Sequence, residues 1–344
     1  MAALIGLASA GLMGAAATAA TSAIDPGVTA KAVKLGYVFS HTGIAASTGK
    51  NAGTAFQARI DRQNAQGGVN GRKIETEIID DASSGANLTA AQDLVQNRHV
   101  FMVVDNSAFA FLAYRYLLEQ GVPMIGCGCD GNYYGDKGNE SMFSIGGNFA
   151  SFNGLGYDTI AKVMKQLGAT KSAGLGYGVS ASSTAAVKTF QDYAVPAQGL
   201  KAAYTNTSVD FGTSDVNPLA LGIKNAGADA AFLPMVASTD ISIVQALAQN
   251  GVTMKANMLA TGYGQELLDS PAAATLGPNT VFFQTFKPVE IADKATKQFQ
   301  ADLKKYAGYT GVPDFSQYTG YIAGELAILG LQHAGTTPSR RGFT

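Results

Sequence analysis

The sequence VKLGYVF (residues 33–39) is an apolar run of strand length, followed by NAGTAFQARIDRQN (51–64) and KIETEII (73–79). In the middle segment Ala52, Phe56 and Ile60 recur every four residues, which places them on one face of a helix. The turn signal Asn70-Gly71 stands directly before the third segment, which we interpret as a second strand. Two strands joined by a helix run parallel in one sheet. This stretch therefore predicts a βαβ unit.

The same alternation continues along the chain in two blocks. The first block continues with predicted helices and strands at 88–97, 100–104, 108–120 and 122–125, and a looser stretch follows at 126–147. The second block has predicted helices at 153–167, 183–193, 218–225 and 241–250, and predicted strands at 173–177, 202–204, 230–235, 257–260 and 281–285. We therefore predict an α/β fold of two doubly wound parallel-sheet lobes.

Two further predicted helices, 294–306 and 318–333, have no strand of their own. We expect them to cover the first sheet, so that the chain crosses between the lobes more than once. The predicted organisation is a signal peptide at 1–23, a first lobe at 33–147 and 286–344, and a second lobe at 148–285.

Composition limits the function classes. The chain has 344 residues, which is enough for about two domains at roughly 150 residues each. Only 14% of the residues are charged, and the net charge is −1 with both signs scattered. A protein that neutralises nucleic-acid phosphates needs a basic stripe, and none is present. We therefore expect no nucleic-acid partner.

The N-terminus has the character of a secretion signal. Residues 2–20 carry no charge, and small-residue cleavage patterns follow at Ala17-Thr18-Ala19 and Thr21-Ser22-Ala23. A membrane anchor is the alternative, because about 20 apolar residues can span a bilayer. No Lys or Arg precedes the run, which a start further upstream would explain. We expect a soluble periplasmic protein without a lipid anchor.

The two cysteines, Cys127 and Cys129, are one residue apart. An even count in an exported protein suggests a disulfide. However, a C-x-C bridge closes a very small ring, so we expect two free thiols and keep the bridge as the alternative. A metal site is not expected, because no His or further Cys is nearby in the sequence.

The segment NAQGGVNGRKIETEIIDDAS (64–83) resembles the leucine/isoleucine/valine-binding family of type I periplasmic binding proteins. The matching features are Gly67-Gly68, Asn70-Gly71, Lys73 and the paired Asp80-Asp81. Further matches occur in the same order along residues 33–340, including Thr42-Gly43, Gly121–Ile125 and Asp210-Phe211. The resemblance implies two lobes that close on a ligand around a hinge. It also implies a longer C-terminus, so we expect this chain to be a fragment.

The resemblance also implies ligand-binding positions. In the first lobe these are Thr48, Ser107 with Ala108, and the loop residues Gly128, Cys129 and Asp130. Ser107 precedes a predicted helix whose N–H groups favour an anion, although a plain N-cap role is compatible. Asp130 stands where the family has a hydroxyl, and it either pairs with a ligand amine or faces solvent.

The second lobe departs from the family pattern. Ser182 replaces a usual Tyr, Val236 and Ala237 replace aromatic residues, and Gly262 lies near the family's acidic clamp for the ligand amine. Tyr263 is our candidate for a substitute lid. These changes predict a ligand with one anionic end and a bulkier, less polar body than an α-amino acid. The first-lobe disulfide positions of the family hold Ser83 and Asn106, so that bridge is absent.

An enzyme is not indicated. The motif Gly126-x-Gly128-x-x-Gly131 follows a strand, but no helix opens after it as a dinucleotide site requires. Asp80 and Asp81 are neighbours in a strand and point to opposite faces, so we interpret them as structural. We predict a monomeric solute-binding protein without a cofactor that serves an ABC permease. The alternatives are a ligand sensor for a membrane receptor and, more remotely, an enzyme on a similar fold.

Overall fold

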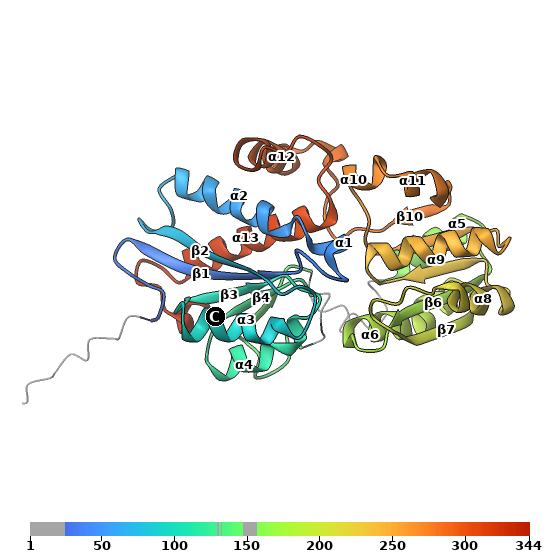
Figure 1. Cartoon of the computed structure of the whole chain (residues 1–344), viewed down its shortest axis with the longest axis horizontal. Coiled ribbons are helices and arrows are strands. Elements are labelled where there is room, and N and C mark those ends of the chain that lie inside the picture. The colour runs from blue at the N-terminus through green and yellow to red at the C-terminus, as the bar shows by residue number, and fades with distance from the viewer. Residues whose placement is uncertain (1–24, 129–130, 132, 147–156) are drawn as a thin grey trace, which may run out of the picture.

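The computed structural model describes residues 25–128, 131, 133–146 and 157–344. Two parallel five-stranded sheets lie side by side, each with helices on both faces (Figure 1). The first sheet has the order β2-β1-β3-β4-β5. Its strands are β1 (Ala32–Phe39), β2 (Lys73–Asp80), β3 (Met102–Asp105), β4 (Met124–Gly126) and β5 (Met142–Ser144). The second sheet has the order β10-β9-β8-β6-β7. Its strands are β6 (Lys171–Tyr177), β7 (Lys201–Val209), β8 (Ala230–Leu233), β9 (Ala256–Leu259) and β10 (Thr280–Phe282). The predicted fold class is confirmed.

The first sheet is covered on one face by α2 (Ala52–Ala65) and α13 (Phe315–His333). On the other face lie α3 (Ala86–Gln96) and α4 (Tyr114–Glu119). Helices α2 and α13 pack closely at Gly320, where there is no room for a side chain: a Cβ at this position would lie 2.0 Å from the Ala52 carbonyl oxygen. We predicted that the helices at 294–306 and 318–333 cover the first sheet, and α13, the second of them, does so. Helix α12 (Lys294–Ala307) instead packs on α2 and α13, since Phe299 and Leu303 bury against those helices.

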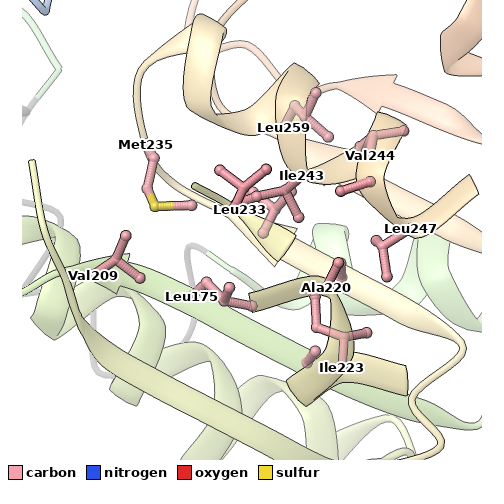
Figure 2. Close-up of a cluster of buried hydrophobic side chains, with 14 of the residues drawn as sticks. Leu175, Val209, Ala220, Ile223, Leu233, Met235, Ile243, Val244, Leu247 and Leu259 are labelled. Atoms are coloured by element: carbon pink, nitrogen blue, oxygen red, sulfur yellow. The ribbon is translucent and has the colours of Figure 1, made fainter. Parts of the chain in front are cut away.

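The second sheet has a core on each face. One core joins Leu175 and Leu233 to Ile223 of α8 (Asn217–Asn225) and to Ile243 and Leu247 of α9 (Ala237–Gln249) (Figure 2). The other core lies under α5 (Asp158–Gln166) and α6 (Ala181–Thr189). The remaining elements are α1 (Ala46–Gly49), α7 (Val195–Ala197), α10 (Gln265–Leu268), α11 (Pro271–Leu276), α14 (Arg340–Phe343), the 3-10 helices η1 (Ala110–Leu112) and η5 (Val289–Ile291), and the π-helix η4 (Phe190–Ala194).

Several predicted element boundaries are wrong. The helix predicted at 108–120 is divided into η1 and α4, and the Phe109 N–H donates to the Ser107 hydroxyl (3.0 Å) in the turn before η1. Strand β5 lies in the stretch interpreted as irregular. Helix α9 begins at Ala237 and not at Ile241. The prediction missed its first turn because Ser238, Thr239 and Asp240 are polar and lack the apolar spacing that predicts a helix.

The signal peptide predicted at 1–23 lies outside the described residues. Among the residues that the structure does describe, none of the helices has the length and apolar character needed to cross a membrane. The predicted lobe boundaries remain a prediction.

Candidate functional site

A cavity of about 150 Å³ lies between the two sheets. It is lined from the first lobe and the crossover segments by Thr48, Ala108, Cys127, Ile145, Phe286, Phe315, Thr319 and Ile322. The second lobe contributes Tyr157, Tyr177, Phe211, Phe232 and Phe283, three serines near the start of α6 (Ser180, Ser182 and Ser183), and residues that follow β8 (Pro234, Met235 and Val236). The cavity therefore joins both lobes, as expected where the carboxyl ends of parallel strands face each other.

The lining is apolar and aromatic, with hydroxyl groups as its polar component. Among the described lining residues there is no Asp, Glu, Lys, Arg or His. A zwitterionic ligand needs both an anion partner and a cation partner, because burying an unpaired charge is costly. These residues offer hydroxyls and apolar contacts and no counter-charge for an ammonium group.

The ends of the strands place the aromatic side chains. Tyr177 is the last residue of β6, and its ring centroid lies 4.2 Å from that of Phe211, which follows β7. The Tyr177 hydroxyl donates to Thr239 Oγ1 (2.9 Å) and accepts from the Val236 N–H (3.4 Å). Burial raises the pKa of Tyr177, so this hydroxyl stays protonated and remains a neutral donor.

Four of the predicted ligand residues come together at the cavity. Thr48, Ala108, Ser182 and Val236 line it, although they come from four distant parts of the sequence. Ser107, Gly128 and Tyr263 do not line it. Cys129 and Asp130 lie outside the described residues. The ligand roles of these nine residues remain predictions.

Ser107 belongs to a buried polar network at the carboxyl ends of β1, β2 and β3. Its side chain is fully buried, and its hydroxyl donates to the Asp81 carboxylate. Asp81 also accepts from the Ser40 hydroxyl (2.9 Å), the Ser83 N–H (2.9 Å) and the Asn87 amide (3.2 Å). The predicted helix behind Ser107 is the short element η1, so its expected role as the start of a long helix is wrong.

Asp80 points the other way, as its strand position predicts. Its carboxylate is exposed and accepts from the Thr42 hydroxyl (2.6 Å) and from the N–H groups of His41 and Ala82 (2.9 Å each). Partial burial opposes ionisation, but these hydrogen bonds outweigh it and hold the pKa of Asp80 below its usual value. The structure thus gives each carboxylate hydrogen-bond partners within the first lobe.

Tyr263 lies in an aromatic cluster next to the crossover segment. Its hydroxyl donates to Glu290, and its ring centroid lies 5.9 Å from that of Tyr318 and 6.3 Å from that of Phe286. Phe286 lines the cavity, so Tyr263 is one side chain removed from it. Its predicted lid role would require a movement that this structure does not show.

Cys127 is disulfide-bonded, so the expectation of two free thiols is wrong. The chain's other cysteine, Cys129, lies outside the described residues. In the described part of the chain, no group of three or more His, Cys, Asp or Glu could hold a metal ion.

Sequence reasoning missed the aromatic part of the lining. Tyr177, Phe211 and Phe283 each end a parallel strand or follow one within two residues. That position was a usable signal, because ligands bind beyond the carboxyl ends of such strands. Phe315, Thr319 and Ile322 gave no such signal, because they come from α13, which packs on the first sheet.

Two doubly wound lobes with a cavity between them define a two-domain solute-binding architecture. The family model for periplasmic binding proteins matches residues 32–344, and the chain belongs to this family. Members of the family are periplasmic substrate-binding proteins rather than enzymes, and they work with the permease components of ABC transporters.

Solved structures show the same fold. A fatty acid ABC transporter substrate-binding protein from Thermomonospora curvata is 20% identical, with a TM-score of 0.77 over 93% of this chain and 81% of that one. A solute-binding protein from R. palustris in complex with benzoate is 16% identical, with a TM-score of 0.72 over 91% and 84%. A branched-chain amino acid binding protein from Streptococcus pneumoniae in complex with isoleucine is 21% identical, with a TM-score of 0.75 over 91% and 88%. No curated protein sequence matches the chain.

Proposed function

We propose that this chain delivers a small monocarboxylate with an aromatic or apolar body to an ABC importer. The lining of the cavity is the observation that carries the proposal. Seven aromatic side chains line it, and no basic or acidic side chain does among the described residues. A dry apolar cavity of about 150 Å³ accommodates one benzene ring. The size and chemistry therefore suit a single ring better than a zwitterionic amino acid.

The carboxylate end requires hydrogen-bond donors. The Ser107 hydroxyl donates to Asp81 and the Ser183 hydroxyl to the Pro234 carbonyl (2.9 Å), so we place the anion at the start of α6 beside Ser180 and Ser182, which line the cavity. The N-terminus of a helix attracts an anion through its N–H groups and its dipole. The benzoate and 4-hydroxybenzoate in two structures of similar fold support a ligand of this class.

A thermal-shift screen tests the ligand class. We expect benzoate or 4-hydroxybenzoate at 100 times its Kd to stabilise the fold by about 2.7 kcal/mol, which raises Tm by about 5–10 °C in a domain of this size. Leucine, isoleucine and valine serve as the comparison set. A shift with these amino acids and none with the aromatic acids would contradict the proposal. Denaturing the natively purified protein and analysing the released small molecules by mass spectrometry identifies any ligand carried from the cell.

Export is the second part of the proposal. We expect the mature chain to begin between Thr21 and Ile24 and to be recovered from the periplasm without lipid, since small residues precede these positions. N-terminal sequencing of the periplasmic protein measures this directly. Recovery of exported protein with Met1 still attached would show that no signal peptide is removed.

A further inference from the structure

Helix α9 has no N-terminal cap from its own lobe. Its N-cap residue is Val236, whose side chain has no oxygen to accept a hydrogen bond. The Ala237 N–H donates instead to Thr48 Oγ1 (3.1 Å), and the Ser238 N–H donates to Ser47 Oγ (3.3 Å). Ser47 and Thr48 belong to α1 of the first lobe, which reaches across to the start of α9 (Figure 1). Two N–H groups of α9 are therefore satisfied from the opposite lobe.

Several other helices carry caps from their own N-cap side chains, whereas the N-cap residues of α2, α3, α5 and α8 make no side-chain cap hydrogen bond. Ser180 accepts from the first turn of α6, Asp293 from that of α12, and Asp314 from that of α13. At α9, in contrast to α6, α12 and α13, the side chains that accept from the first turn belong to the opposite lobe. When the lobes separate, the N–H groups of Ala237 and Ser238 lose these partners.

We propose that Ser47 and Thr48 form a detachable N-cap, so that closure of the lobes caps α9 and part of the ligand affinity comes from this contact. Ser47 is the informative member of the pair. It does not line the cavity, whereas Thr48 does. Ser47 also donates to the Ser238 hydroxyl (3.2 Å), which orients its oxygen toward the helix. Ser47 is therefore a positioning residue that acts through α9 and not through the ligand.

A second contact between the lobes provides a matched control. Lys50 Nζ lies 2.7 Å from Glu266 of α10, and the two side chains are 42% and 51% exposed. An exposed ion pair contributes little, and salt screens it. Glu266→Gln should therefore change closure less than Ser47→Ala, although both substitutions act on contacts between the same two lobes.

Amide hydrogen exchange measured by NMR tests the cap in the full chain without ligand. Substituting a serine cap by alanine shifts an equilibrium by about 2- to 30-fold. We expect Ser47→Ala to speed exchange at the Ser238 amide by a factor in that range, with the buried strand amides of β3 unchanged. Ser47→Thr keeps the hydroxyl and should restore slow exchange. Unchanged exchange at Ser238 in Ser47→Ala would overturn the proposal.

The effect on affinity rests on the proposed function, and benzoate is the probe. Isothermal titration should give a Kd that rises by the same factor in Ser47→Ala, stays near wild type in Ser47→Thr, and changes less in Glu266→Gln. A Ser47→Ala protein that exchanges faster at Ser238 and yet binds benzoate as tightly as wild type would overturn the link to affinity. If wild type binds no aromatic acid, the proposed ligand class fails, whereas the exchange experiment still decides the cap.

Discussion

Asp81→Ala should lower the free energy of unfolding of the first lobe by about 3–5 kcal/mol, the largest stability effect that we expect from a single substitution at the strand ends. Asp81 is fully buried and accepts from Ser40, Ser83, Asn87 and Ser107. A buried donor that loses its acceptor costs about 1–3 kcal/mol. The hydroxyl donors can reorient and water can enter, so we expect the total loss of unfolding free energy to be smaller than four times this cost.

Asp80→Ala is the matched control, because it removes the neighbouring carboxylate from the same strand end. Asp80 is exposed, so water replaces the lost acceptor for Thr42 and for the N–H groups around it. We expect a loss of about 1–2 kcal/mol. Thermal unfolding monitored by circular dichroism measures both variants. At about 2–4 °C per kcal/mol, Asp81→Ala should lower Tm by at least about 6 °C. Equal losses for the two variants would show that the network around Asp81 is not a stabilising unit.

The same network explains why the role of Ser107 could not be read from the sequence. A serine before a predicted helix is equally consistent with a ligand contact and with a cap. What decides the direction of its hydroxyl is Asp81, which lies 26 positions earlier in the chain. Substituting Ser107 should therefore affect folding as well as any binding, in contrast to a residue that serves the ligand alone.

The fold was predictable because short sequence patterns indicate most of its strands and helices. The apolar run in β1, the Asn70-Gly71 turn before β2 and the four-residue spacing in α2 are each visible within one short window. Strand β5 was not predictable, because Met142–Ser144 is only three residues long and pairs along β4 alone among the described residues. The start of α9 was also not predictable from a short window, because the side chains that accept from its first N–H groups, Ser47 and Thr48, lie about 190 residues away in the sequence.

The candidate site was only partly predictable. Thr48, Ala108, Ser182 and Val236 were placed by resemblance to a family, and the structure brings them to one cavity. Of the aromatic side chains that surround them, Tyr177, Phe211 and Phe283 had a usable signal in their positions at strand ends. Phe315 had none, because it comes from α13, which packs on the first sheet. Tyr177 and Phe211 contact because they lie at the carboxyl ends of the neighbouring parallel strands β6 and β7.

Ala108→Phe should weaken binding of the ligand by at least about 100-fold while leaving the protein folded. Ala108 lies in the loop after β3, is partly exposed, and packs against the core of the second lobe across the cavity. A phenyl group at this position occupies the space of about one benzene ring, which is nearly all that a cavity of this size provides. A ligand ring that loses roughly 150 Å² of burial forfeits about 4 kcal/mol, which is close to a thousandfold in Kd.

Leu112→Phe provides the control, because Leu112 lies four residues further along in η1, is 38% exposed and does not line the cavity. It adds an aromatic ring to the same segment and should leave Kd within about twofold of wild type, since exposed substitutions away from a site have small effects. Isothermal titration with the acid that gives the largest thermal shift measures all three proteins, and circular dichroism verifies that each is folded. If Ala108→Phe binds that acid as tightly as Leu112→Phe, the ligand does not occupy this cavity, and the site must be sought elsewhere between the lobes.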